Sequence, residues 1–282
     1  MIHTSRQLKN LVRNMAKGNS TKAQIIIRNY MMERFLERLS LSKYRDNFIL
    51  KGGVLISTMV GLDMRATMDI DTSVKNLPLT VADIEHITKE VSAVPIDDGV
   101  TFEIKSVTSI MDEADYGGIR VMIEGKLDPI KTPLKIDIST GDVITPKEIS
   151  YQLRTMFDNR PITVWAYNLE TVLAEKLETV ITRGVANTRM RDFYDLYILG
   201  ETQSNAFDIN DLKLAFEATC KSRESEHLLK DAELILSEIG ENDVMKKQWI
   251  GYQNKFDYAG DIAWNEVVGA IKGLVNEVMG EE

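Results

Sequence analysis

The sequence has 282 residues, of which 44% are hydrophobic and 27% are charged, and its net charge is −9. This composition is typical of a globular protein and excludes collagen-like and low-complexity chains. The single cysteine, Cys220, excludes an internal disulfide, and the three histidines have no zinc-ligand spacing with it. Residues 1–20 lack the apolar core of a signal peptide, and no apolar run approaches the roughly 20 residues of a membrane span. We therefore expect a cytoplasmic protein with no membrane partner.

Charge is distributed unevenly along the chain. Residues 1–66 contain 12 Lys and Arg against 4 Asp and Glu, a balance of +8, whereas the remainder has a balance of −17. Such asymmetry can mark a surface that faces phosphates, but solvated helix faces would produce it equally. Charge alone leaves both interpretations open.

The first predicted elements are helices. Residues 4–45 have helical periodicity, and Ser20 or Thr21 can cap a long helix. Most of the cations of this long helix fall off its apolar stripe, which makes them candidates for an RNA-facing surface: Lys22, Arg28, Arg34 and Arg38.

Strands and further helices follow. A short apolar segment at 48–50 leads through two glycines to a predicted buried helix at 54–60, and alternation over 68–74 predicts a strand. Thr80 begins another helix. Further strand character is found at 101–110, 118–123, 134–139 and 162–165, and helical patterns are found at 169–181, 191–199, 209–221, 228–239 and 262–278. We expect an α+β protein with N-terminal helices and a mixed sheet core in a first domain, 1–165, and a helical C-terminal domain, 166–282.

The strongest chemical signal is a pair of carboxylates. Asp69 and Asp71 are separated by one residue on a predicted strand, so both side chains point to the same face. Adjacent carboxylates repel unless a cation bridges them, and such oxygen ligands suit Mg²⁺ with a bound triphosphate. Asp137, on a later strand with the same alternation, would join them if the two strands were neighbours. The alternative is the ordinary polar face of a half-exposed strand.

A glycine pair precedes the buried helix. Gly52 and Gly53 would let backbone N–H groups approach a phosphate, and Lys51 lies directly before them. A simple turn at the start of a helix would explain the same residues. Neither a Walker loop nor a dinucleotide fingerprint is present.

The order of these features resembles the nucleotidyltransferase fold shared by DNA polymerase β and the CCA-adding enzymes. In that fold Gly-Ser precedes a helix, whereas here Gly53 replaces the serine and the spacer to the aspartates is slightly longer. A more specific resemblance, over residues 48–199, is to the AbiEii/AbiGii toxin family. It is carried by Phe48-Ile-Leu-Lys-Gly-Gly53, Arg65-Ala-Thr-Met-Asp-Ile-Asp71, Ala174-Glu-Lys176 and Arg191-Asp-Phe-Tyr-Asp-Leu-Tyr197.

This resemblance implies a toxin of a phage-defence (abortive-infection) or toxin–antitoxin system, acting as a polymerase-β-like nucleotidyltransferase. Such proteins use an NTP, with GTP favoured, together with Mg²⁺, and some relatives modify the 3′ end of tRNA. The cognate antitoxin is expected to act without stable contact with the toxin. Catalytic roles are implied for Asp69, Asp71, Lys176 and Asp192, metal binding for Asp69, Asp71 and Asp137, and nucleotide binding for Lys51, Gly52, Gly53, Thr67, Lys176 and Arg183.

The C-terminal residues are compatible with these roles. Lys176 lies beside the apolar stripe of its helix and could reach a triphosphate, and Arg183 is seven residues further on nearly the same face. Asp192 could orient Lys176 or accept a proton from an attacking hydroxyl. Asp195 is explained more simply as a charge that complements a helix dipole.

Two other functions stay open. The chain could be a regulatory module that binds an NTP and releases no pyrophosphate, or a nucleotidyltransferase that modifies protein side chains. The basic first quarter favours an RNA acceptor over a protein acceptor.

Overall fold

The computed structural model describes residues 1–110 and 117–280 and divides the chain into two units. Unit 1 consists of residues 1–62, 66–142 and 149–166, and unit 2 consists of residues 63–65, 143–148 and 167–282. Unit 1 contains a mixed sheet and unit 2 is built from helices, so the expected α+β class is confirmed. Within the described ranges, none of the helices combines the length and apolarity needed to cross a membrane.

Unit 1 is built around a seven-stranded sheet with the order β3-β4-β5-β2-β1-β7-β6. The β2–β5 and β1–β7 pairs are parallel, and the other neighbouring pairs are antiparallel. The elements of unit 1 are α1 (Ser5–Ala16), α2 (Ser20–Leu41), β1 (Phe48–Lys51), α3 (Gly52–Val60), β2 (Asp69–Val74), α4 (Val81–Ser92), β3 (Thr101–Ile110), β4 (Gly118–Leu127), β5 (Ile130–Thr140), β6 (Ile149–Arg154) and β7 (Pro161–Ala166).

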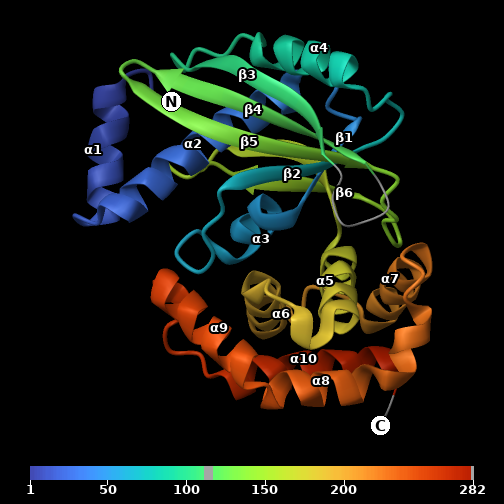
Figure 1. The fold of residues 1–282 in the computed structure, drawn as a ribbon. Coiled ribbons are helices and arrows are strands. Elements are labelled where there is room, and N and C mark those ends of the chain that lie inside the picture. Colours follow the sequence, from blue (N-terminus) through green and yellow to red (C-terminus); the bar gives the residue numbers. More distant parts are fainter. Residues whose placement is uncertain (111–116, 281–282) are drawn as a thin grey trace. The chain divides into compact units, whose positions relative to one another are not determined.

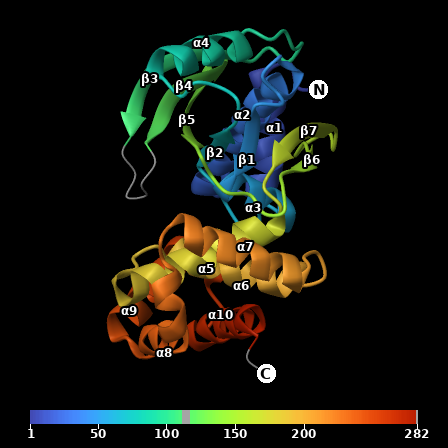
Figure 2. The ribbon, with the colours of Figure 1, turned by 90° about the vertical axis from the view of Figure 1, so that its right-hand side faces the viewer.

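One side of the sheet is the core of unit 1. Ile70, Ile136 and Ile138 alternate with polar neighbours along their strands and are buried on this side. Helices α2 and α4 lie against it (Figures 1 and 2). The residues that alternate with these apolar side chains therefore point to the opposite, polar face of the sheet.

Unit 2 contains six α-helices within its described part: α5 (Leu169–Arg183), α6 (Met190–Gln203), α7 (Ile209–Ser222), α8 (Ala232–Glu241), α9 (Asp243–Lys255) and α10 (Trp264–Met279). Its core is rich in aromatic side chains, and Trp264 contacts both Phe193 and Trp249. Asn168 caps α5 by accepting from the Thr171 N–H.

The long second helix differs from the sequence-based expectation in two ways. Its cap is Asn19 rather than Ser20 or Thr21, and the Asn19 side chain accepts from the Lys22 N–H. The expectation that Arg34 and Arg38 are exposed is wrong, because they are only 2% and 3% exposed.

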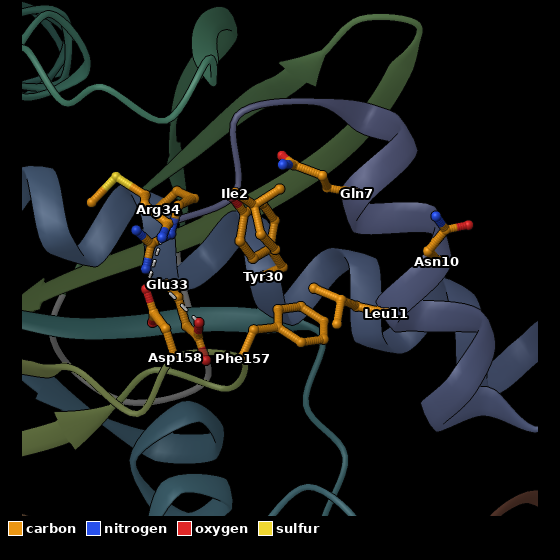
Figure 3. Close-up of a pocket in the computed structure, with 10 residues that line it drawn as sticks. Ile2, Gln7, Asn10, Leu11, Tyr30, Glu33, Arg34, Phe157 and Asp158 are labelled. Atoms are coloured by element: carbon orange, nitrogen blue, oxygen red, sulfur yellow. Dashed lines mark ion pairs between the residues drawn. The ribbon is translucent and has the colours of Figure 1, made fainter.

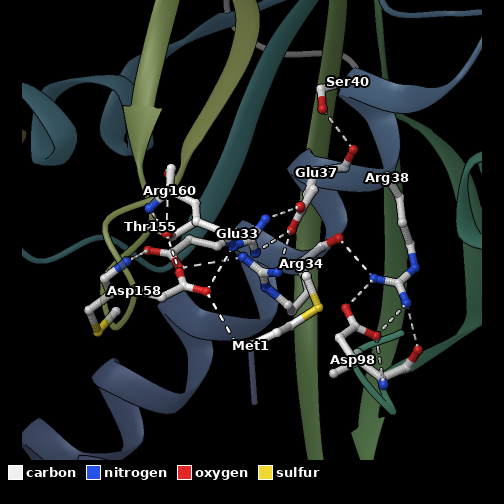
Figure 4. Close-up of polar contacts among 12 residues, drawn as sticks. Met1, Glu33, Arg34, Glu37, Arg38, Ser40, Asp98, Thr155, Asp158 and Arg160 are labelled. Atoms are coloured by element: carbon white, nitrogen blue, oxygen red, sulfur yellow. Dashed lines mark hydrogen bonds and ion pairs between the residues drawn. The ribbon is translucent and has the colours of Figure 1, made fainter. Parts of the chain in front are cut away.

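Both arginines are buried because they have carboxylate partners (Figure 4). Arg38 donates to both carboxylate oxygens of Asp98, each at 2.8 Å, and Arg34 pairs with Glu37. Two of the four cations that were candidates for an RNA-facing surface are therefore in the core, and the other two, Lys22 and Arg28, are half-buried.

Candidate active site

Strand pairing brings three carboxylates to the polar face of the sheet. In the parallel β2–β5 pair, Asp71 lies opposite Asp137 and Asp69 lies opposite Lys135. Residues that lie opposite each other on neighbouring strands share a face. The strands of Asp69–Asp71 and of Asp137 are therefore neighbours, which was the condition for a cluster of the three aspartates.

Two cations accompany these carboxylates. Arg120, opposite Asp137 on β4, donates to both carboxylate oxygens of Asp137, each at 2.8 Å. Lys135 Nζ lies 2.8 Å from an oxygen of Asp69 and 3.5 Å from one of Asp137. Neither cation was predicted as a site residue from the sequence, although the alternation in Lys135-Ile136-Asp137 places Lys135 on the face of the aspartates.

Asp71 is held by the glycine pair. The Gly53 N–H donates to Asp71 Oδ2 at 3.3 Å. Burial raises the pKa of Asp71, and the charges of Asp137 and Asp69 raise it further, against the opposing effects of the Gly53 hydrogen bond and Lys51. The Asp71 carboxylate therefore lies where an added positive charge would be favourable.

Lys51 and Thr67 lie close to this cluster along the chain but make other contacts. Lys51 pairs with Asp142, with Nζ 2.9 Å from Oδ2. The Thr67 side chain is buried, and the Thr67 carbonyl accepts from Asn29 Nδ2 at 3.3 Å. Thr67 therefore fixes the segment that leads into β2, two residues before Asp69.

In unit 2, Lys176 of α5 lies between two carboxylates of α6. Its Nζ is 2.7 Å from Asp192 Oδ1 and 2.8 Å from Asp195 Oδ2. The structure thus brings Lys176 and Asp192 together. It also corrects the view of Asp195 as a simple dipole-complementing charge, because Asp195 is fully buried. Arg183 is the last residue of α5 and is half-buried.

Arg65 belongs to the same network of unit 2 and was missed as a site residue. Its Nε and one terminal nitrogen lie 2.9 and 3.0 Å from the two carboxylate oxygens of Asp195. Burial by itself would raise the pKa of Asp195, but Lys176 and Arg65 hold it at about 2. Burial would lower the pKa of Lys176, yet Asp192 and Asp195 hold it above its usual value, so the ammonium stays charged.

The oxygen donors of Asp69 and Asp71 suit a hard divalent cation, and the raised pKa of Asp71 fits a site short of positive charge. Asp137 fits less well, because Arg120 occupies both of its oxygens, whereas Lys135 pairs with one oxygen of Asp69. Over residues 1–110 and 117–280, no group of three or more His, Cys, Asp or Glu side chains is arranged to hold a metal ion. Asp69 and Asp71 are therefore the ligand candidates that the structure favours.

Comparisons with known proteins agree with this architecture. JHP933 from Helicobacter pylori has 16% sequence identity and a TM-score of 0.54, over 92% of this chain and 93% of that one. A second H. pylori structure, described as a candidate nucleotidyltransferase, has 17% identity and a TM-score of 0.54, over 92% and 98% of the two chains. At these identities the two structures show a common fold.

Sequence comparisons identify the family. A search of curated protein sequences gave no significant match. The family model described as "Nucleotidyl transferase AbiEii toxin, Type IV TA system" matches residues 34–270. Because this match covers most of the chain, the chain belongs to the AbiEii family of nucleotidyltransferase toxins of type IV toxin–antitoxin systems.

Proposed function

We propose that the chain transfers NMP from an NTP, with GTP favoured, to the 3′ end of a tRNA, and that it does so with Mg²⁺ as part of a phage-defence system. The observation that carries the proposal is the pairing of β2 with β5, which places Asp69, Asp71 and Asp137 on one face of the sheet. The Gly53 N–H at the start of α3 fixes Asp71 on that face. Family membership supports the reaction class.

In the proposed reaction, the acceptor hydroxyl attacks the α-phosphorus of the NTP. The new O–P bond forms as the bond from the α-phosphorus to the bridging oxygen breaks, and pyrophosphate leaves. Bound Mg²⁺ would supply charge neutralisation of the phosphates. Asp69 and Asp71 would hold the ion, and the Gly53 hydrogen bond would keep Asp71 oriented toward it.

Other residues would bind and neutralise the nucleotide. Arg120 and Lys135 lie on the face of the aspartates and pair with Asp137 and Asp69. When a triphosphate binds, these two cations could exchange their carboxylate partners for its phosphates. Following the family pattern, we assign nucleotide contacts to Lys51, Gly52, Gly53, Thr67, Lys176 and Arg183. Asp192, which holds the Lys176 ammonium, is the positioning partner of that lysine or the acceptor of the hydroxyl proton.

The test is incubation of the whole protein with each α-labelled NTP, total RNA and Mg²⁺. We expect label in tRNA, most from GTP, with release of pyrophosphate. Asp71→Asn should lower the rate by about 100-fold or more, since removing one group that positions transition-state charge has effects of that order. Asp97→Asn, which alters an exposed carboxylate in the loop between α4 and β3, is the matched control and should keep the wild-type rate.

Each alternative function has its own outcome in this experiment. Label recovered in protein rather than RNA would favour a protein-modifying enzyme. Binding of NTP without release of pyrophosphate would favour a regulatory module. The regulatory-module alternative gains some support from the ion pairs of Arg120 and Lys135, which already neutralise two of the carboxylates.

A further inference from the structure

Unit 1 contains a cavity on the side of α2 that faces α1, away from the strand residues described above. Its volume is about 410 Å³, within the range of small-molecule sites. Leu11 of α1, Tyr30 of α2 and Phe157 of the β6–β7 loop supply apolar walls, and Gln7 and Asn10 of α1 line it with amide groups (Figure 3). The charged side chains of Glu33, Arg34 and Asp158 also line it.

The cavity wall contains unused hydrogen-bonding capacity. Tyr30 is 3% exposed, and its hydroxyl has no hydrogen-bond partner within the described residues. Burial raises the pKa of Tyr30 to about 12, so the hydroxyl remains a donor at neutral pH. The Tyr30 and Phe157 rings lie 5.9 Å apart at an interplanar angle of 55°. An aromatic wall with an unsatisfied buried donor is suited to a flat ligand with acceptor atoms at its edge, as a nucleobase is.

A row of cations lies on the same helix as the amide groups. Arg6, Lys9 and Arg13 share one face of α1, and Lys17 follows at its C-terminal cap; we call these four residues the α1 cation row. All four are exposed, α1 contains no Asp or Glu, and no ion pair within the described residues involves any of the four. At 1.5 Å per residue the row extends over about 16 Å.

The row borders the cavity, and the cavity is linked to the strand that carries the aspartates. Arg13 donates to Asn10 Oδ1 at 3.1 Å, and Asn10 lines the cavity. Next to Tyr30 in α2, Asn29 Nδ2 donates to the Thr67 carbonyl, two residues before Asp69.

We propose that the cavity and the α1 cation row bind the acceptor RNA, with one unpaired base in the cavity and the neighbouring phosphates on the row. The inference rests on the proposed RNA acceptor and names the surface that holds it. A stacked strand carries one phosphate for about every 3.4 Å of its helix axis, so a row of about 16 Å faces several of them. This length fits a polynucleotide better than a free nucleotide.

The first test removes the charges of the row. The variant Arg6→Gln/Lys9→Gln/Arg13→Gln/Lys17→Gln is compared with the matched control Lys213→Gln/Lys221→Gln/Lys230→Gln/Lys247→Gln, which removes four exposed cations of unit 2. Binding of labelled bulk tRNA and of a short single-stranded RNA is measured over a salt series. We expect at least about a tenfold decrease in the affinity of the row variant, and a salt slope that is shallower by roughly 0.7 for each phosphate that the variant no longer neutralises.

The second test addresses the cavity. Leu11→Trp should fill it and weaken RNA binding about tenfold by excluding a stacked base, whereas Leu41→Trp, at an exposed position of α2, should bind as wild type. Tyr30→Phe removes only the unpartnered hydroxyl, so we expect unchanged thermal stability together with weaker RNA binding. Thermal melts of all variants show that they are folded.

The outcomes separate this inference from the proposed function. Wild-type RNA affinity in the row variant overturns the inference, and so does an equal decrease in RNA affinity in the unit 2 control. A row variant that binds RNA normally but no longer binds anionic lipid vesicles also overturns it. A cavity that takes AMP or CMP as tightly as it takes RNA overturns the choice of a polynucleotide. If the wild-type protein binds RNA through this surface but labels none, the proposed function fails while the inference stands.

Discussion

Gly52 leaves no space for a side chain beside the carboxylate of Asp71. Its φ is +63°, and a Cβ built at this position would lie 2.3 Å from Asp71 Oδ2. The sequence pattern alone suggested that the glycine pair allows the close approach of a phosphate. The structure adds a second reason, because the start of α3 must pass directly against the carboxylate of Asp71.

Gly52→Ala should therefore abolish the proposed activity by displacing Asp71. We also expect a decrease of about 1–2 kcal/mol in the free energy of unfolding, from the left-handed backbone conformation. The matched control is Gly61→Ala at the other end of α3, where φ is +93° but nothing lies within 4 Å of an added Cβ. Both variants should be less stable in denaturant melts, but only Gly52→Ala should lose nucleotidyl transfer. Full activity in a folded Gly52→Ala protein would show that Asp71 tolerates the displacement.

At the scale of elements, local patterns predicted the strands that carry the candidate site. The alternation in Asp69-Ile70-Asp71 and in Lys135-Ile136-Asp137 identified β2 and β5, because each strand has one buried apolar face. β6 was not predicted. It is an edge strand that pairs, among the described strands, with β7, and most of its side chains are exposed, so its sequence lacks a clear apolar face.

The ion-pair partners of the buried arginines could not be predicted from local sequence patterns. The partner of Arg38 is Asp98, 60 residues away, and the partner of Asp137 is Arg120, which depends on the β4–β5 register. Periodicity within one segment records which face of an element is apolar but contains no information on distant partners. Arg34 and Arg38, which lie off the apolar stripe of their helix, were therefore expected to be exposed, whereas they are buried in ion pairs.

Lys176 of α5 is another cation whose carboxylate partners, on α6, are not evident from the periodicity of its own helix. The stem of Lys176 lies beside the apolar stripe of α5, and that packing by itself would be kept in a Lys176→Met variant. Its ammonium, however, lies between the buried carboxylates of Asp192 and Asp195. Removing one partner of a buried ion pair leaves an uncompensated charge.

We therefore expect Lys176→Met to lower the free energy of unfolding by about 3 kcal/mol, whatever its effect on nucleotide binding. Lys213→Met, which removes an exposed lysine of α7, should change it by less than about 0.5 kcal/mol. Chemical denaturation of the two variants beside the wild type measures the difference. Arg65 also pairs with Asp195, and Arg189 Nε lies 2.7 Å from Asp192 Oδ2. Equal stability of the two variants would mean that these two arginines are enough to compensate both carboxylates.

At the scale of the whole molecule, unit 2 depends on residues that are remote in sequence. Arg65 pairs with Asp195, and the Met64 carbonyl accepts a hydrogen bond from the Tyr194 hydroxyl. Asn168 Nδ2 donates to the carbonyls of Thr145 and Lys147. The two inserted segments, 63–65 and 143–148, are too short to show a hydrophobic period of their own, so the sequence contains no local signal for their place in unit 2.

The fragment 167–282 should therefore fold poorly by itself, although it contains all six α-helices described for unit 2. Without residues 63–65 the carboxylate of Asp195 loses a bidentate guanidinium partner in the core, a change whose cost is about 3–5 kcal/mol and comparable to the stability of a small domain. We expect helical far-ultraviolet circular dichroism, weak near-ultraviolet signals from Trp249 and Trp264, and a broad thermal transition.

In the whole chain, Arg65→Met should destabilise the protein by a similar amount, while Arg45→Met, at an exposed position, should not. A fragment that unfolds cooperatively at the temperature of the whole chain would show that the six helices pack without Arg65, and the buried pair would then be dispensable for the fold of unit 2.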